Sequence, residues 1–272
     1  MKILTTFLAM LAVGAMAQGK PGAATNAVVT TVPTGLRLVT MDGKEGATAP
    51  AQEEGKDGIA RIHKVDPALL ELHPAAGGAS RGTIMVCPGG GYGILAVEHE
   101  GRAIAKLLND CGYDAAILLY HVSAGKETRD LAIEDAKAGL ALLRAQGAKL
   151  GLKTDRIGAM GFSAGGHLAA RLAHETAAAP LDLLVLMYPA YLEKDGAVLD
   201  DVAPAATPAF VYVAGDDHYS PSSKAFAAAC EAKKIPCELH VQPKGGHGFG
   251  LKATLPEGVR DWPDTLRAFL KK

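Results

Sequence analysis

One pentapeptide in this chain, Gly161-Phe162-Ser163-Ala164-Gly165, has the spacing of a serine nucleophile on a tight turn. It matches G-x-S-x-G and lies between a predicted strand at 156–160 and a predicted helix at 164–176. In such a strand-to-helix turn the glycines leave space beside the serine, whose hydroxyl is exposed at the helix N-terminus. The helix amides there favour developing negative charge. We therefore expect Ser163 to be a nucleophile rather than a helix cap.

A serine hydroxyl needs a base, and His247 is the best candidate among the nine histidines. It lies in Gly245-Gly246-His247-Gly248, just after the last predicted strand at 239–242. The base belongs at this point because the order along the chain for this turn motif is serine, acid, histidine. His167 lies in the first turn of the helix after Ser163, where we expect it to pack or cap rather than catalyse.

The acid should follow the predicted strand at 209–214, and two aspartates do so. Asp216 and Asp217 stand side by side there, shortly before a predicted helix at 221–234. Position along the chain does not decide between them. The aspartate that is not the acid is expected to form a turn or to cap the following helix.

A run of glycines, Pro88-Gly89-Gly90-Gly91-Tyr92, follows the first strongly apolar strand. Without Cβ atoms, its backbone N–H groups can approach a substrate oxygen closely. The N–H groups of Gly90, Gly91 and Ala164 together could hold the oxyanion of a tetrahedral intermediate, where one such donor contributes about 3 kcal/mol. Tyr92 is the aromatic side chain that we expect to contact the substrate.

Apolar strands alternate with helical stretches along the chain, which predicts an α/β fold with a mostly parallel sheet and helices on both faces. Ligands of such sheets bind at the carboxyl ends of the strands, where each motif above is placed. The strands are expected at 59–65, 69–73, 83–87, 115–120, 156–160, 183–188, 209–214 and 239–242, and the helices at 101–109, 128–146, 164–176, 221–234 and 262–270.

The first 17 residues are predicted to be a signal peptide. Lys2 precedes an apolar run at 3–13, and Ala15-Met16-Ala17 fits an A-x-A cleavage site, so we expect export to the periplasm or the exterior. Residues 18–58 are rich in Ala, Gly, Thr and Pro and predict an irregular leader, which leaves 59–272 as the catalytic domain.

Charge and cysteine content limit the possible partners. The net charge is −1, from 28 Lys+Arg and 29 Asp+Glu, which gives no reason to expect a nucleic acid or an anionic membrane as partner. No stretch is long enough for stable insertion into a bilayer, which needs about 20 apolar residues.

The four cysteines, at 87, 111, 230 and 237, match no zinc pattern and are expected to be free thiols. Cys230 and Cys237 are the pair most open to bridging.

Taken together, these motifs resemble the acetyl-esterase and acetyl-xylan-esterase-like branch of the α/β-hydrolases. This branch is related to the hormone-sensitive-lipase group, with PGGG in place of HGGG. The resemblance runs from about Ile59 to the C-terminus and implies an eight-stranded core and a Ser-Asp-His triad. In this branch the acid lies four residues before a proline, which implies Asp217 before Pro221. The motifs that carry the resemblance are CPGGGY at 87–92, HEG at 99–101, GFSAGGHLAA at 161–170, YP at 188–189, GDD at 215–217 and ELHVQPKGGHGFGL at 238–251.

Two features depart from the family pattern. Tyr120-His121 stands where the family usually has Tyr-Arg, so the role of that arginine does not carry over. The segment between Tyr188 and Pro208 is short and leaves little material for a lid. An open site favours short acyl groups on a bulky alcohol, such as the acetyl esters of xylan.

The expected function is therefore a serine esterase that needs neither a metal nor an organic cofactor. Its expected substrate is a small acyl ester or an acetylated glycan, and the oligomeric state is left open. The alternatives are a general short-chain carboxylesterase, a peptidase, a lipase for longer acyl chains, or a non-catalytic binding protein. A carbohydrate-binding module is disfavoured by the single tryptophan, Trp262.

Overall fold

The computed structural model describes residues 28–30, 33–78, 80–123 and 128–272. The signal peptide predicted at 1–17 and the start of the predicted leader lie outside these residues. Within the part that is described, no helix is long and apolar enough to cross a membrane.

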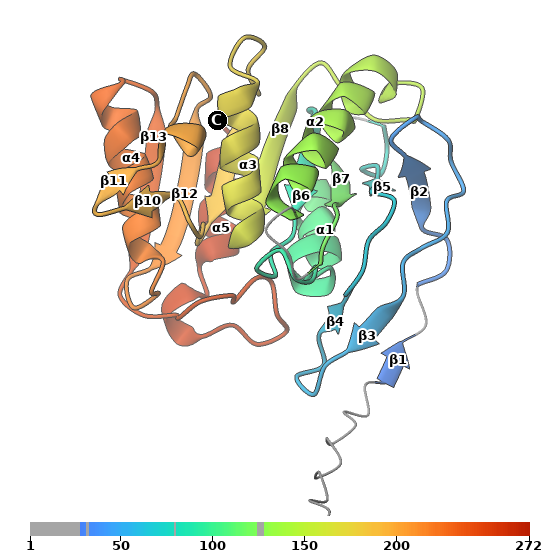
Figure 1. The fold of residues 1–272 in the computed structure, drawn as a ribbon, viewed down its shortest axis with the longest axis horizontal. Helices are drawn as coiled ribbons and strands as arrows, with labels where there is room; N and C mark the ends of the chain where they lie inside the picture. Colours follow the sequence, from blue (N-terminus) through green and yellow to red (C-terminus); the bar gives the residue numbers. More distant parts are fainter. Residues whose placement is uncertain (1–27, 31–32, 79, 124–127) are drawn as a thin grey trace, which may run out of the picture.

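The core is a mixed sheet of eight strands in the order β13-β12-β9-β8-β6-β7-β5-β2 (Figure 1). The six strands from β13 to β7 run parallel, whereas β5 runs antiparallel to both of its neighbours. The predicted eight-stranded, mostly parallel sheet is therefore confirmed. Its strands are β2 (Arg37–Thr40), β5 (Leu69–His73), β6 (Thr83–Cys87), β7 (Asp114–Leu119), β8 (Ile157–Phe162), β9 (Leu184–Met187), β12 (Ala209–Ala214) and β13 (Cys237–Gln242).

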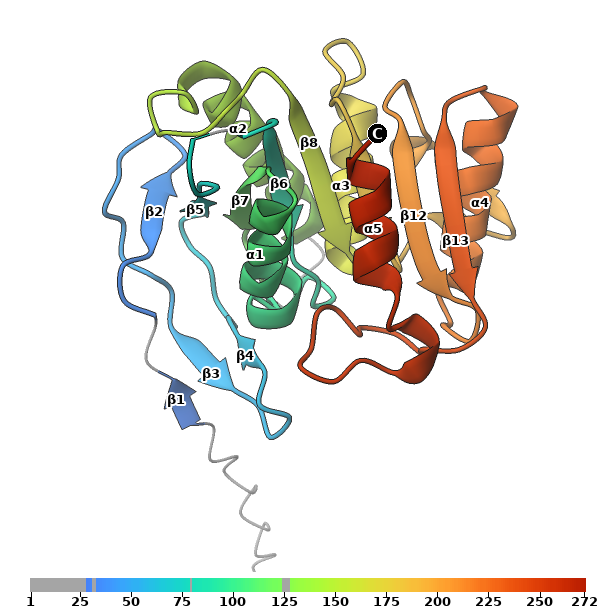
Figure 2. The same cartoon turned by 180° about the vertical axis from the view of Figure 1, so that it is seen from behind.

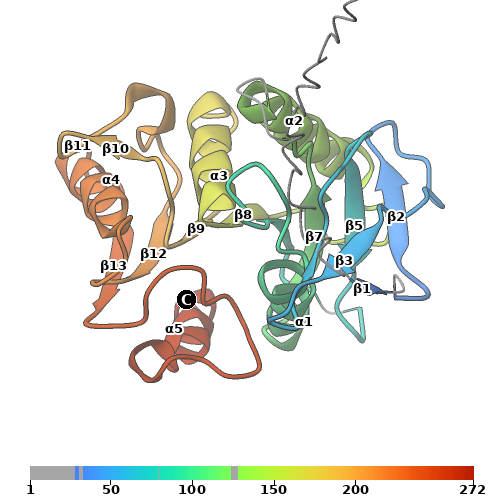
Figure 3. The same cartoon turned by 60° about the horizontal axis from the view of Figure 1, so that its bottom comes forward.

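Helices cover both faces of this sheet, as predicted. One face carries α2 (Thr128–Gln146), α3 (Ala164–Glu175) and α4 (Ser220–Ala232), which are in front in Figure 1. The other carries α1 (Ala103–Asp110) and α5 (Trp262–Leu270), which are in front in Figure 2. Figure 3 shows the sheet between these two layers.

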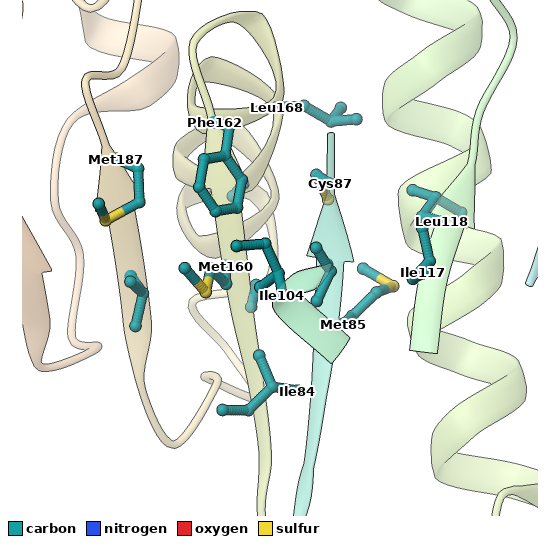
Figure 4. Close-up of a cluster of buried hydrophobic side chains, with 14 of the residues drawn as sticks. Ile84, Met85, Cys87, Ile104, Ile117, Leu118, Met160, Phe162, Leu168 and Met187 are labelled. Atoms are coloured by element: carbon teal, nitrogen blue, oxygen red, sulfur yellow. The ribbon is translucent and has the colours of Figure 1, made fainter. Parts of the chain in front are cut away.

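The central strands are buried along their whole length because both of their faces are covered. Every residue of β6, β7, β8 and β12 is buried. Figure 4 shows Met85, Ile117, Met160 and Phe162 among the side chains that fill this region. Each such side chain contributes roughly 1.5–3 kcal/mol through burial. This core gives the loops at the strand ends a rigid base.

The described part of the predicted leader is not irregular, and that expectation is wrong for these residues. The strand β2 pairs antiparallel with β5 and adds an edge to the main sheet, with Leu38 and Val39 buried. Outside the main sheet, β1 (Val28–Thr30), β3 (Gln52–Glu54) and β4 (Ala60–Arg61) form a small antiparallel sheet. Of the strand predicted at 59–65, only the two residues of β4 are in a strand.

The segment between β9 and β12 holds only short elements. The hairpin of β10 (Glu193–Lys194) and β11 (Ala197–Val198) packs against α4, and a single 3₁₀ turn follows at Asp200–Val202. The hairpin thus lies against α4 and the 3₁₀ turn against α3, and the segment is as short as noted from the sequence.

All four cysteines lie within the described residues and are free thiols. Trp262, at the start of α5, is fully buried, and its indole N–H donates to the carbonyl of Gly250 at 2.9 Å. The tryptophan therefore fixes the loop after β13 to the closing helix and leaves no exposed surface for stacking on a sugar.

Candidate active site

Ser163 occupies the sharp turn between β8 and α3 in a backbone conformation that side chains rarely adopt. Its φ is 52° and its ψ is −117°. The turn requires glycines on both sides, because a Cβ on Gly161 would collide with the carbonyl oxygen of Gly165 and one on Gly165 with that of Cys87. The strained turn places the hydroxyl at the N-terminus of α3, at the carboxyl end of the sheet.

The structure brings the three residues predicted as nucleophile, acid and base into one hydrogen-bonded chain. The hydroxyl of Ser163 lies 2.8 Å from Nε2 of His247, and Nδ1 of His247 lies 2.7 Å from Oδ2 of Asp217. Oδ1 of the buried Asp217 accepts the backbone N–H of Tyr219 at 2.8 Å. Both carboxylate oxygens are thus engaged, which fixes the plane of the carboxyl group and with it the imidazole.

Asp216 has a different position, although it neighbours Asp217. Its Oδ1 accepts the backbone N–H groups of Gly245 and Gly246, each at 2.9 Å. It therefore holds the loop that carries His247 but does not contact the imidazole. Of the two candidates left open by chain order, Asp217 is the one that contacts the imidazole of His247.

The glycine loop after β6 faces the same cavity as Ser163. Gly90 has φ 136° and Gly91 has φ 63°, so the loop runs through conformations that favour glycine. Among the described residues, neither amide donates a hydrogen bond. Gly90 and Gly91 line the cavity that also contains Ser163, whereas Ala164 at the start of α3 is buried.

Tyr92 does not lie where the sequence predicts, and its assignment to substrate contact is wrong. The residue is buried, and its hydroxyl lies 2.6 Å from Nδ1 of His167. It does not line the cavity at Ser163. Burial lowers the pKa of His167 to about 4, so that this histidine is neutral and packs against Tyr92 instead of acting as a base.

A cavity of about 360 Å³ opens at Ser163, and the aromatic side chains on its wall were missed from the sequence. Three of them form the aromatic rim: Tyr191, His218 and Tyr219. The rings of His218 and Tyr219 each lie 5.2 Å from the imidazole of His247, and Tyr191 lies 5.2 Å from Tyr219. A signal was available, because His218 and Tyr219 follow the acid directly in the sequence.

Further contacts stiffen this rim. The guanidinium of Arg129 lies 4.4 Å from the centre of the Tyr191 ring, which is cation–π geometry. Burial and a hydrogen bond to Tyr191 raise the pKa of Tyr219 to about 12, so the hydroxyl stays protonated at neutral pH. No group of three or more His, Cys, Asp or Glu side chains in the described ranges is placed to hold a metal ion.

The fold is that of an α/β-hydrolase, with its loops gathered at the carboxyl ends of β6, β8, β12 and β13. Within this class, the model of the BD-FAE family matches residues 72–233, so the chain belongs to the BD-FAE family. This confirms the resemblance to the α/β-hydrolases that the motifs carry.

Two curated relatives match this chain, each with 27% identity over a region that covers 62% of this chain. One is an acetylxylan esterase of Xylanibacter ruminicola, and the other is an endo-1,4-beta-xylanase B of Butyrivibrio fibrisolvens. The matched region spans only 41% and 32% of these two relatives.

Solved structures share the fold over most of the chain. An acetyl ester-xyloside bifunctional hydrolase from Caldicellulosiruptor lactoaceticus is 27% identical, with a TM-score of 0.63 over 80% of this chain and 93% of that one. The α/β hydrolase MGS-M1, from a Medee basin deep-sea metagenome library, is 23% identical, with a TM-score of 0.66 over 87% of this chain and 96% of that one.

Proposed function

We propose that this chain is an exported serine esterase that removes acetyl groups from carbohydrates, with Ser163 as nucleophile, His247 as base and Asp217 as the orienting acid. The observation that carries the proposal is the chain of hydrogen bonds from Ser163 through His247 to Asp217, at 2.8 and 2.7 Å. Such a chain activates a hydroxyl that is otherwise a weak nucleophile.

The proposed mechanism has two halves. As Ser163 Oγ attacks the ester carbonyl, His247 takes its proton and Asp217 stabilises the imidazolium. The N–H groups of Gly90, Gly91 and Ala164 hold the oxyanion. The alcohol leaves with the proton from His247, and a water that is deprotonated by His247 then releases the acid from Ser163.

The aromatic rim supports a sugar as the leaving alcohol. The departing oxygen receives its proton from His247, so the alcohol has to lie on the side of the imidazole, where His218 and Tyr219 are packed. Aromatic rings offer a pyranose a flat apolar surface and hydroxyl groups at their edge. A volume of about 360 Å³ suits one sugar ring with a short acyl group.

The names of the relatives agree with this class of substrate. An acetylxylan esterase and a xylanase are among the curated relatives, and a hydrolase of acetyl esters and xylosides is among the solved structures. Action on a plant-type glycan also requires the enzyme to meet a polymer outside the cytoplasm, which the signal peptide predicted at 1–17 would permit.

The test is acetate release from acetylated xylo-oligosaccharides, beside a series of p-nitrophenyl esters from acetate to octanoate. We expect release from the oligosaccharides, kcat/KM falling from acetate to octanoate, and no activity in Ser163→Ala. A preference for octanoate would contradict the acyl assignment. Fast hydrolysis of simple acetates without release from any acetylated glycan would favour a general carboxylesterase instead.

A further inference from the structure

Glu100 is a fully buried carboxylate close to the proposed active site that the mechanism above does not use. It belongs to the HEG motif and lies in a single turn of π-helix at Glu98–Arg102. Only 3% of the residue is exposed. Burying a charge is costly unless hydrogen bonds compensate for it, so the contacts of this side chain require an explanation.

Each carboxylate oxygen of Glu100 holds a different loop. Oε2 accepts the backbone N–H of Gly89 at 2.8 Å, at the base of the glycine loop. Oε1 accepts the hydroxyl of Tyr188 at 2.7 Å, and this hydroxyl in turn accepts the N–H of Gly250 at 2.8 Å. One carboxylate therefore links the glycine loop to the loop that follows His247.

These contacts adjoin the groups that would react. A Cβ on Gly89 would lie 2.7 Å from Oε2 of Glu100 and 3.0 Å from Cβ of Ser163, so the glycine is wedged between the two side chains. On the other side, the ring of Tyr188 lies 5.1 Å from the imidazole of His247 in an edge-on arrangement. A shift of the carboxylate would move both loops relative to Ser163.

The turn that carries Glu100 is itself fixed. The guanidinium of Arg102 donates from two nitrogens to the two oxygens of the buried Glu71 in β5, each at 2.8 Å. The N–H of Leu251 donates to the carbonyl of His99 at 2.7 Å, which adds a further tie to the loop after His247. The central sheet therefore sets the position of the Glu100 carboxylate.

Opposing effects act on the ionisation of this group. Burial raises the pKa of Glu100 above its ordinary value, and the bonds from Tyr188 and Gly89 offset only part of that rise. The same two donors are placed to bond both oxygens of the ionised form. The nearby His99 gives no compensating charge at neutral pH, because burial lowers its pKa to about 4.

We propose that Glu100 is a positioning residue that sets the separation between the oxyanion donors and His247, acting through Gly89 on one side and through Tyr188 and Gly250 on the other. The proposal rests on the proposed function. Small errors in such a separation reduce the rate of the chemical step more than they reduce substrate binding.

The direct test is Glu100→Gln, which keeps the size of the side chain but has only one acceptor oxygen. If its NH₂ group faces the N–H of Gly89, that tie is lost; if it faces Tyr188, the hydroxyl must accept instead of donate and its own hydrogen loses its acceptor. With an acetyl ester, we expect kcat to fall by about 10- to 100-fold, the range for one lost hydrogen bond to a buried charge, while KM changes by less than about threefold. Glu98→Gln is the matched control, because Glu98 lies on the same turn with a half-exposed side chain.

The affinity for a transition-state analogue shows whether Glu100 positions the oxyanion donors or only stabilises the fold. A trifluoromethyl ketone forms a hemiketal with the serine and needs the oxyanion donors, so its affinity should fall in parallel with kcat in Glu100→Gln. Tyr188→Phe removes only the hydroxyl of the same link. The double variant should lose little more than Glu100→Gln alone, because the two groups act through one chain.

The outcomes distinguish this inference from the proposed function. If the wild type hydrolyses no acetyl ester, or Ser163→Ala stays active, the proposed function fails. If the wild type is active and Ser163→Ala is not, a folded Glu100→Gln with kcat within threefold of wild type overturns the role of Glu100 alone. Additive losses in the double variant overturn it as well. If Glu100→Gln does not fold, Tyr188→Phe decides: lowered kcat with steady KM supports the link, and unchanged kcat overturns it.

Discussion

The two sides of the cavity at Ser163 are built from different kinds of contact. Behind the serine lies the buried support, namely Asp217, Glu100 and Tyr188, in which each polar side chain is hydrogen-bonded at 2.7–2.8 Å. In front lies the aromatic rim, where the side chain of His218 is 69% exposed. Changing the support leaves a buried partner unsatisfied, whereas changing the rim removes only a contact surface. Chemistry and specificity should therefore respond differently to mutation.

The largest effect is expected where the two sides meet. Ser163→Ala should lower kcat by about 10⁶-fold, since removal of a triad nucleophile leaves only the oxyanion donors and binding. The hydroxyl contributes little to packing, so the circular dichroism spectrum and the melting temperature should stay close to those of the wild type. Activity within tenfold of wild type would exclude Ser163 as the nucleophile.

Within the buried support, the two neighbouring aspartates should differ by orders of magnitude. Asp217→Asn should lower kcat by roughly 10⁴-fold, because the amide favours the wrong tautomer of His247. Asp216→Asn keeps an oxygen that can accept from Gly245 and Gly246, so its loss should stay within about tenfold. Steady-state kinetics on p-nitrophenyl acetate measures both. A reversed order would show that the acid is Asp216.

The pH dependence of stability tests a histidine behind the serine. The folded-state pKa of His167 is about 4, below its ordinary value of 6.5. Above pH 6.5 His167 is neutral in both the folded and the unfolded protein, and the free energy of unfolding is at its full value. Between pH 6.5 and 4 the unfolded chain binds a proton that the folded protein does not bind. The free energy of unfolding therefore falls in this range. The loss from His167 should reach up to about 3 kcal/mol.

Urea unfolding between pH 4 and 7 measures this loss. His167→Gln should reduce the pH dependence of the free energy of unfolding, and the part that remains includes His99, whose pKa burial also lowers to about 4. The exposed His218→Gln is the control and should leave that dependence in place. An equal slope in the wild type and in His167→Gln would contradict the buried, neutral state of His167.

The smallest effect is expected at the aromatic rim. Tyr219→Ala should lower kcat/KM on acetylated xylobiose by about fivefold, corresponding to about 1 kcal/mol of lost stacking. The loss on ethyl acetate should be smaller, because this alcohol has no ring to stack. Tyr219→Phe keeps the ring and should stay within twofold of wild type on the sugar. Equal losses on both substrates would exclude Tyr219 from contact with the alcohol.

The order of the site residues along the chain could be predicted because each one follows a recognisable strand. Ser163, Asp217 and His247 come after β8, β12 and β13, and the carboxyl ends of parallel strands meet at one edge of a sheet. Each motif can be recognised within a few residues, and the parallel sheet then brings these distant motifs close together. Strand order was enough for Ser163 and His247, whereas the choice of Asp217 over Asp216 came from the family resemblance.

What the sequence did not provide was the direction in which side chains point. Tyr92 follows the glycine loop but turns inward to His167, whereas Tyr219 lies on the cavity wall. Burial depends on the packing of α3 against the loop, which one-dimensional spacing does not encode. The edge strand β2 was also missed. Its four residues are too few to show an alternating or apolar pattern within a stretch rich in Ala and Gly.

The pairing of β13 with β12 at one end of the sheet has a consequence for when the enzyme becomes active. A chain that folds as it is synthesised makes Ser163 and its turn well before His247. Under the proposed triad, the hydroxyl has no base unless β13 pairs with β12 and Trp262 fixes the following loop to α5. A chain cut before β13 should therefore keep the serine turn but lack the group that activates it.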